Sequence, residues 1–264
     1  MINLTDIKTP VVELINRTGK FIKEEKGKII DKEVDVKSKN SFVTYVDKKA
    51  EQMLVEGLQK IIPNSSFLAE EGTGDQNESN YLWIIDPLDG TTNFINDIYP
   101  VSISVALQYK KKTVAGIVYE IGNDEMFAAF EGEEAKLNGN TISVSERNKL
   151  EDAFLATGFP YYDYEKLPGY LNALSEFMKT TTGLRRLGSA ATDLAYVACG
   201  RFDGYFEYSL SPWDVAAGAF IVQQAGGYVQ DFKGKDDYIY GKEIIATNPH
   251  LASEIQKIIA DHLK

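Results

Sequence analysis

The feature that most constrains this chain is the octapeptide DPLDGTTN at residues 86–93, which directly follows the apolar run YLWII. An apolar run of that length with turn-forming residues behind it predicts a buried strand that ends at Asp86 and turns at Pro87 and Gly90. Asp86 and Asp89 then lie together on a turn, where their oxygens suit the hard cations that proteins bind through carboxylates. Gly90 allows a ligand to approach the backbone closely, and the N–H groups of residues 90–92 at the start of a helix attract an anion. The octapeptide therefore predicts a site for metal and phosphate, although an ordinary turn with a helix cap produces the same pattern.

Two further acidic segments have a comparable context. FLAEEG at residues 67–72 is a short apolar strand that ends in Glu70 and Glu71, and because strand side chains alternate between faces, only one of the two can face an ion. WDVAAG at residues 213–218 opens an Ala-rich buried helix that ends before Gly226. Asp214 lies in the first turn of that helix, where the helix dipole favours a carboxylate and where a plain capping role explains it equally well.

These three segments, in their order and spacing, resemble the three signature blocks of the inositol monophosphatase family, and the resemblance runs over essentially the whole chain. It implies an α+β fold, a layered α/β/α/β/α sandwich with largely antiparallel sheets. It also implies a single domain over residues 1–264, with a metal-binding half at about 1–150 and a second half at about 151–264. Blocks of strands followed by helices agree with α+β layers.

The resemblance assigns ligands of metal and phosphate. The implied metal ligands are Glu70, Asp86, the Leu88 carbonyl, Asp89 and Asp214. Asp86 would bridge two ions, and the backbone of Asp89, Gly90 and Thr91 would hold the phosphate. The number of Mg²⁺ ions is two or three, because the connection at residues 37–41 resembles the mobile loop of the family only loosely.

The resemblance also assigns catalytic and substrate-binding residues. Thr91, paired with Asp47 and assisted by Glu70, would orient the attacking water, although Asp47 at a helix start also fits a plain cap. The residues implied to contact the alcohol moiety of the substrate are Gly188, Ser189, Ala190 and Glu207. Glu207 on an edge strand could equally be solvated, and Arg185 and Arg186 are expected to form surface ion pairs rather than to bind a second phosphate.

Charge supports a metal enzyme that acts on small molecules. The net charge of −11 argues against a nucleic-acid or anionic-membrane partner, because both need a basic surface. Four carboxylates in one pocket, with no Lys or Arg in the motifs, need compensation, and Mg²⁺ prefers such a site with substrate phosphate. Mn²⁺ is a possible substitute by family resemblance, whereas Li⁺ and Ca²⁺ are expected to inhibit.

Rare residues exclude other chemistry. The single cysteine, Cys199, permits no intrachain disulfide. Both histidines, His250 and His262, lie in the C-terminal segment, which leaves little for a Ser-His-Asp triad or a His-rich zinc site. No secretory leader or membrane span is recognisable, so we expect a cytoplasmic protein, and the family implies a homodimer.

Periodicity and turn residues predict the remaining elements. Helices are predicted at residues 4–25, 47–62, 167–179, 190–199 and from 248 onward, where Asn248 would be the cap and Pro249 the first helical residue. Strands are predicted at residues 101–109, 113–120, 125–130, 153–157 and 204–207, and a hairpin or mobile loop at 26–40.

Taken together, the sequence predicts a Mg²⁺-dependent, lithium-sensitive phosphomonoesterase that acts on inositol monophosphate or a related ester. The same chemistry on fructose 1,6-bisphosphate, NADP or 3′-phosphoadenosine 5′-phosphate is the alternative. The alternative hypothesis outside the enzymes is a non-catalytic protein that binds a metal or another ligand.

Overall fold

The structure, a computed structural model, describes residues 2–28, 34–38, 41–74, 79–161 and 163–263. The α-helices of these residues are α1 (Leu4–Glu25), α2 (Tyr45–Ile61), α3 (Thr91–Ile95), α4 (Leu167–Thr180), α5 (Ala190–Ala198), α6 (Pro212–Gln224) and α7 (Ala252–His262). None of them is long and apolar enough to cross a membrane.

The strands form two sheets and a separate hairpin. The first sheet has the order β3-β4-β5-β6-β7-β8-β9 and the second the order β11-β10-β12-β14-β13. The strands of the first sheet are β3 (Ser66–Ala69), β4 (Tyr81–Asp89), β5 (Ser102–Tyr109), β6 (Lys112–Glu120), β7 (Glu125–Phe130), β8 (Lys136–Leu137) and β9 (Asn140–Thr141). Those of the second are β10 (Phe154–Thr157), β11 (Gly183–Arg185), β12 (Gly204–Tyr208), β13 (Tyr228–Gln230) and β14 (Glu243–Thr247).

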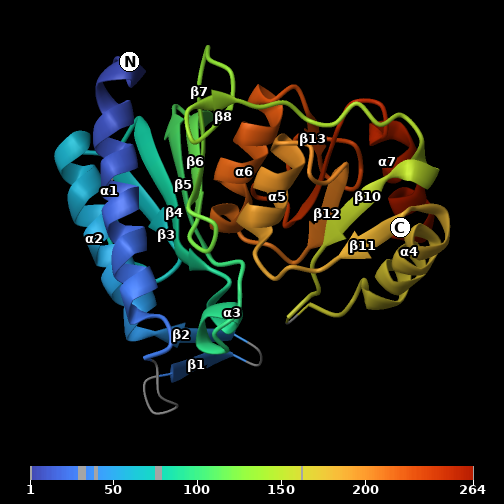
Figure 1. The fold of residues 1–264 in the computed structure, drawn as a ribbon, viewed down its shortest axis with the longest axis horizontal. Helices are drawn as coiled ribbons and strands as arrows, with labels where there is room; N and C mark the ends of the chain where they lie inside the picture. Colours follow the sequence, from blue (N-terminus) through green and yellow to red (C-terminus); the bar gives the residue numbers. More distant parts are fainter. Residues whose placement is uncertain (1, 29–33, 39–40, 75–78, 162, 264) are drawn as a thin grey trace.

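The layers follow one another as α/β/α/β/α, which confirms the predicted fold (Figure 1). Helices α1 and α2 cover one face of the first sheet, α5 and α6 fill the space between the sheets, and α4 and α7 cover the outer face of the second sheet. In the first sheet all pairs are antiparallel except β3 with β4. The second sheet is mixed, because β10 runs parallel to both β11 and β12.

Strand alternation explains how the first sheet joins two cores. Trp83 and Ile85 of β4 belong to the core under α1 and α2, whereas Ile84 between them belongs to the core around α5 and α6. Since successive strand side chains point to opposite faces, an uninterrupted apolar run is what a strand buried on both faces requires. Burial on both faces holds the end of β4 firmly in place.

The end of β4 differs from the prediction. The strand continues through Pro87 to Asp89 instead of turning at Pro87, and its register against β5 shifts between Asp86 and Asp89. Asp86 lies opposite Ser104, and Asp89 opposite Ser102. Residues three apart point to opposite faces of a regular strand, but the extra residue of this bulge puts both aspartates on the same face.

Two other predictions need correction or limits. The C-terminal helix begins at Ala252, because Asn248 instead closes a turn in which its Oδ1 accepts from the N–H groups of His250 and Leu251 at 3.0 and 3.1 Å. A hairpin is present as β1 (Val34–Ser38) and β2 (Ser41–Thr44), so its second strand lies beyond the predicted range of 26–40. Residues 29–33 and 39–40 of that connection lie outside the described residues, so the family loop at 37–41 stays a prediction.

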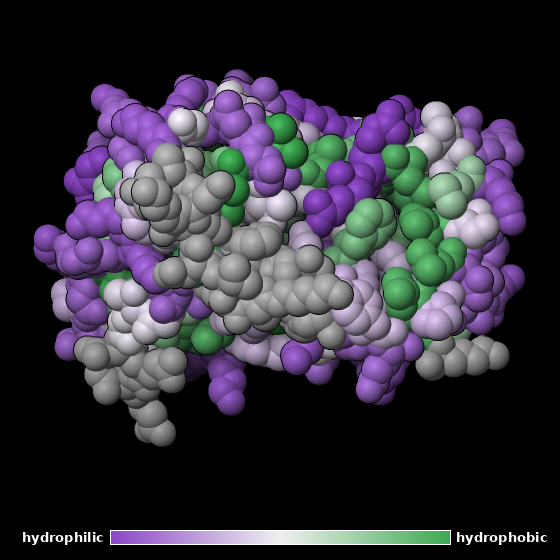
Figure 2. All heavy atoms as spheres, turned by 90° about the horizontal axis from the view of Figure 1, so that it is seen from below, coloured by the Kyte–Doolittle hydropathy of each residue, from purple (hydrophilic) through white to green (hydrophobic). Residues whose placement is uncertain are grey.

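The face that carries the hairpin and α3 is shown in Figure 2. Hydrophilic side chains dominate the part of this face over the N-terminal half, while hydrophobic ones gather on the right, over the C-terminal half. The C-terminal half also holds several of the large exposed apolar side chains, namely Phe159, Tyr164, Leu171 and Met178.

Candidate active site

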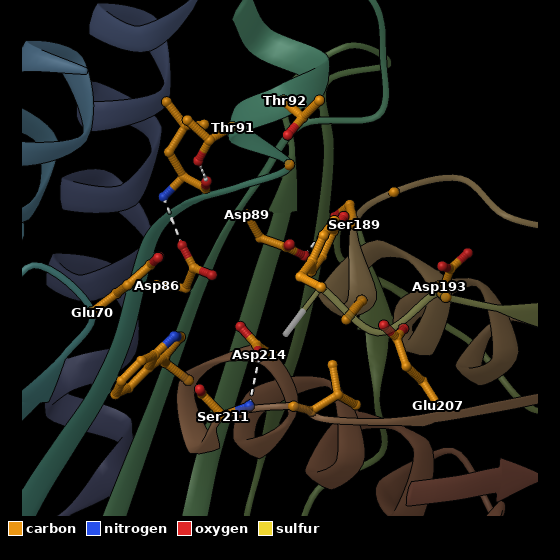
Figure 3. A pocket seen from close by; sticks show the side chains of 18 of the residues that line it. Glu70, Asp86, Asp89, Thr91, Thr92, Ser189, Asp193, Glu207, Ser211 and Asp214 are labelled. Carbon is orange, nitrogen blue, oxygen red and sulfur yellow. Dashed lines mark hydrogen bonds between the residues drawn. The ribbon is translucent and has the colours of Figure 1, made fainter. Parts of the chain in front are cut away.

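The predicted site residues gather in one pocket between the two halves of the chain (Figure 3). It lies where the end of β4 and the start of α3 meet the first turns of α5 and α6. Its lining includes every residue predicted for metal, phosphate and substrate, namely Glu70, Asp86, Leu88, Asp89, Gly90, Thr91, Gly188, Ser189, Ala190, Glu207 and Asp214. Asp47 lies directly behind this lining.

Four carboxylates form one end of the pocket. Glu70 follows the last residue of β3, Asp86 and Asp89 come from β4, and Asp214 comes from the first turn of α6. Asp214 is both a cap and a pocket residue, because its Oδ2 accepts from the N–H of Ser211 at 2.7 Å while its side chain lines the cavity. The two interpretations of Asp214 are therefore compatible.

The environment of these carboxylates opposes their charge. Burial raises the pKa of Asp86 well above its ordinary value, and the neighbouring Glu70, Asp89 and Asp214 raise it further. Burial and the charge of Asp89 likewise raise the pKa of Asp214. Mutual repulsion of this kind is what a bound cation relieves.

Asp89 connects the two halves of the chain. Its Oδ2 accepts hydrogen bonds from Ser189 Oγ, at the N-cap of α5, at 2.6 Å and from the N–H of Ala191, in the first turn of α5, at 2.8 Å. Burial raises the pKa of Asp89 to about 6 even though these two bonds favour the charged form. The predicted phosphate and substrate segments are thus in direct contact.

Thr91 and Asp47 are hydrogen-bonded, as a pair that orients water requires. Thr91 Oγ1 lies 3.0 Å from Asp47 Oδ1 and 3.1 Å from the carbonyl oxygen of Leu88. Asp47 Oδ2 meanwhile accepts from the N–H and hydroxyl of Thr44 at 2.8 and 2.6 Å, which makes it part of the capping box of α2. Asp47 therefore serves as a cap with one oxygen and holds Thr91 with the other.

Gly90 occupies a position where a side chain is not tolerated. Its φ of 96° lies in the left-handed region, and a Cβ added there would come within 3.0 Å of the carbonyl oxygen of Pro100. The glycine thus permits the tight passage from β4 into α3 that presents the backbone of residues 89–91 to the pocket.

Glu207 corrects one part of the sequence prediction. Its strand β12 lies in the middle of the second sheet, not at an edge, and the side chain is only 7% exposed. Its Oε2 accepts from the hydroxyl of Tyr205. Burial nevertheless raises the pKa of Glu207 to about 7. A solvated role for Glu207 is excluded.

Two further residues line the same pocket, namely Arg186, for which the sequence predicted a surface ion pair, and Asp193, which sequence reasoning missed. Among the described residues Arg186 forms no surface ion pair; its Nη2 donates to the hydroxyl of Tyr161, and its charge acts on Asp89 and Glu207. Asp193 belongs to α5 and is 1% exposed. The available signal was a single charge inside the otherwise uncharged helix AATDLAYVA.

The oxygen-rich donor set fits Mg²⁺ in kind, because it combines carboxylates with the Leu88 carbonyl and lacks soft ligands. Among the described residues, no three His, Cys, Asp or Glu side chains stand close enough together to surround an ion without adjustment. The carboxylates lie around a shared space, with Glu70 directed toward Asp86 and with Asp214 reaching into the space from the first turn of α6 (Figure 3).

Comparison with known proteins agrees with this geometry. The sequence model of the inositol monophosphatase family matches residues 3–264. The chain is 42% identical over 235 residues to Nus factor SuhB of Pseudomonas aeruginosa, with 87% of each protein covered.

Two solved structures are similar over nearly their whole length. The extragenic suppressor protein suhB of Bartonella henselae has a TM-score of 0.92 and 38% identity, with 96% of this chain and 98% of that one covered. An IMPase of Thermotoga maritima has a TM-score of 0.86 and 34% identity, with 95% of each chain covered. Because the family match spans the carboxylate cluster, the Thr91–Asp47 pair and the substrate segment together, the chain belongs to the inositol monophosphatase family.

Proposed function

We propose that this protein is a Mg²⁺-dependent phosphomonoesterase whose first candidate substrate is inositol monophosphate. The observation that carries the proposal is the convergence of carboxylates from three separate segments beside a hydrogen-bonded Thr91–Asp47 pair. Membership of the family supports the phosphatase class.

The roles proposed for the acidic end are those of metal ligands. Glu70, Asp86, Asp89 and Asp214, with the carbonyl of Leu88, would hold the ions. When bound, Mg²⁺ lowers the pKa of a bound water. It also stabilises the negative charge that develops on the ester during hydrolysis.

Thr91 is the residue proposed to orient the water. Its hydroxyl can donate to Asp47 Oδ1 while its lone pairs accept a proton of the attacking water, so the pair fixes where the water points. Glu70 faces the same space from the opposite segment. The backbone of Asp89, Gly90 and Thr91, which line the pocket, would hold the phosphate.

The deciding experiment is a turnover assay over a panel of esters. Inositol 1-phosphate, fructose 1,6-bisphosphate, NADP, 3′-phosphoadenosine 5′-phosphate and p-nitrophenyl phosphate are offered with Mg²⁺ and again with excess EDTA. We expect hydrolysis that vanishes in EDTA and returns with Mg²⁺, and an Asp86→Asn variant that is the least active of the single ligand variants. Undiminished activity after exhaustive chelation would overturn the metal mechanism.

A non-catalytic role is the second candidate, because the Pseudomonas aeruginosa relative carries the name Nus factor. On this alternative the pocket binds a ligand without turning it over. The retention of Glu70, Asp86, Asp89, Thr91 and Asp214 in one pocket argues against it. Absence of turnover on the whole panel, combined with measurable Mg²⁺ binding, would favour it.

Three properties taken from the resemblance stay predictions, namely lithium sensitivity, a homodimer and one domain over the whole chain. Lithium inhibition is measured in the same assay, and the homodimer by light scattering on the purified protein.

A further inference from the structure

The end of the pocket away from Asp86 is a second polar cluster that the metal chemistry does not use. Glu207, Asp193, Arg186 and Tyr161 line this end, and Glu207 and Asp193 lie side by side there (Figure 3). Glu207 has a partner in Tyr205, and Tyr161 has one in Arg186. Asp193 stands out within this cluster.

Asp193 is buried without a matching hydrogen bond. It is 1% exposed, and among the described residues its Oδ1 has no hydrogen-bond partner. Buried carboxylate oxygens are almost always paired, because an unpaired one loses its hydration without compensation. Asp203, an equally buried aspartate outside the pocket, shows the usual situation, since it accepts from Ser145, Arg147 and the N–H of Phe154.

An unpaired donor lines the same cavity. The Nε–H of Arg186 is buried and has no partner among the described residues, although the other end of its guanidinium contacts Tyr161. The positive charge of Arg186 acts on Asp193 and on Glu207, so all three groups lie within electrostatic reach of one another. A hydroxyl is the group that can donate to a carboxylate and accept from a guanidinium at once.

The dipole of α5 does not by itself account for the buried carboxylate of Asp193. Asp193 lies in the first turn of α5, where the helix dipole favours a negative charge. The dipole offers no hydrogen bond to Oδ1, however, and burial together with Glu207 and Asp89 raises the pKa of Asp193 well above its ordinary value. The carboxyl is therefore costly where it stands unless a ligand pairs with it.

We infer that Asp193 is a specificity-determining residue that accepts a hydrogen bond from a hydroxyl of the alcohol moiety of the substrate. This inference rests on the proposed phosphatase function and deepens it. Glu207 accepts from one hydroxyl and Asp193 from another, while Arg186 donates to the same part of the ligand. The pocket thereby selects phosphate esters of alcohols that carry at least two further hydroxyls over esters that carry none.

The test compares two substrates in two enzymes. Inositol 1-phosphate has ring hydroxyls, and cyclohexyl phosphate is an ester of a similar ring without them. Asp193→Leu keeps most of the side-chain shape but removes the acceptor. We expect the ratio of kcat/KM for the two esters to fall about ten- to a hundredfold in the variant, the scale of a hydrogen bond to a charged group.

Two further variants separate recognition from folding. Asp193→Asn keeps the volume and one neutral acceptor, so its ratio should lie between those of the wild type and Asp193→Leu. Asp203→Asn removes charge from the buried aspartate outside the pocket, so it should lower the melting temperature and leave the substrate ratio unchanged. Equal losses on both esters in the Asp193 variants would make Asp193 structural and overturn the inference.

A binding measurement distinguishes failure of the inference about Asp193 from failure of the proposed phosphatase function. Wild-type protein that hydrolyses no ester in the presence of Mg²⁺ refutes the phosphatase proposal itself. Calorimetry with inositol 1-phosphate then still tests Asp193. A tenfold or greater loss of affinity in Asp193→Leu, with the melting temperature preserved in Asp193→Asn, supports the contact. Equal affinities of wild type and Asp193→Leu refute it.

Discussion

At the scale of single residues, Glu207 is a carboxylate that is almost completely buried. Its carboxyl is 7% exposed, and a Cβ placed on Gly158 would come within 1.9 Å of its Oε2, so the neighbouring backbone packs directly on the charge. The glycine at residue 158 is what leaves room for the carboxyl. The energetic consequence is a dependence of stability on pH.

We expect Glu207→Gln to stabilise the metal-free protein at about pH 8 and to change little at about pH 4. The folded carboxyl has a pKa of about 7, raised above its ordinary value by burial, so the folded state keeps a proton that the unfolded chain releases. Stability therefore falls as the pH rises from the ordinary value toward 7 and is constant above it. The gain in the free energy of unfolding of the variant at high pH is at most about 3 kcal/mol, since each unit by which the pKa is shifted corresponds to about 1.4 kcal/mol.

Calorimetric melting in EDTA at both pH values measures this effect. The amide of Gln can still accept from Tyr205, so the hydrogen bond is retained in the variant. The same change in melting temperature at both pH values would show that the charge of Glu207 is not responsible.

Thr91 gives the second prediction at this scale. We expect Thr91→Val to lower kcat about 10²–10⁴-fold with a far smaller change in KM, because the hydroxyl positions the water while the backbone still binds phosphate. Since Thr91 and Asp47 act as one hydrogen-bonded unit, the double variant with Asp47→Asn should be little worse than the poorer single variant. Losses that add fully would show that Thr91 and Asp47 act independently, whereas a change confined to KM would assign Thr91 to binding alone.

At the scale of elements, the bulge in β4 is the feature that makes the acidic end of the pocket. The apolar run predicts the strand correctly, but a bulge is a property of pairing between strands and is not visible in one of them. Pro87 is tolerated inside the strand because the bulge breaks the regular ladder. The same limit applies to β12, whose central position depends on pairing with β10 and β14.

Local signals were sufficient elsewhere. The predicted boundaries of α1 and β7 agree with the structure, because helix periodicity and turn residues mark both ends. Ser189 caps α5 directly before the predicted start of that helix, with its side chain accepting from the N–H of Thr192. The late start of α7 was missed because Asn248 suits a helix cap and an Asn turn equally well.

Glu51 of α2 provides the prediction at this scale. Its two oxygens accept from the N–H groups of Glu71 and Thr73, both at 2.7 Å, and the side chain is fully buried. It thereby fixes the chain directly after Glu70. Glu51→Gln replaces one acceptor with an N–H donor that opposes a backbone N–H. The expected loss of stability is about 1–3 kcal/mol, with a higher Mg²⁺ concentration needed for half-maximal activity.

Glu56→Gln is the matched control, since Glu56 lies on the same helix and is exposed. Urea unfolding and Mg²⁺ titration of both variants measure the two effects. If Glu51→Gln loses stability but keeps the Mg²⁺ dependence of the wild type, Glu51 supports the fold without positioning Glu70.

At the scale of the whole molecule, the pocket exists only where the two halves meet. Hydrogen bonds cross this boundary from Ser189 Oγ to Asp89 Oδ2, from Asn93 Nδ2 to the carbonyl of Leu187 at 2.9 Å, and from Ser104 Oγ to the carbonyl of Trp213 at 2.9 Å. The core around α5 and α6 also mixes apolar residues of both sheets. The family resemblance predicted the layers, but such long-range contacts follow from packing and have no local signal in the sequence.

Shared contacts of this kind predict that the two halves unfold together. The chain has two tryptophans, Trp83 in β4 and Trp213 in α6, so each half carries its own fluorescent reporter. In Trp213→Phe the fluorescence of the remaining Trp83 reports unfolding of the first sheet. In Trp83→Phe the fluorescence of the remaining Trp213 reports unfolding of the pocket side of α6.

In each variant we expect the fluorescence midpoint of thermal unfolding to coincide with the midpoint from circular dichroism, as all-or-none unfolding requires. Comparison within each variant cancels any loss of stability that the substitution itself causes. Midpoints that separate in either variant would show that the halves unfold as independent domains, and the single-domain prediction would then be wrong.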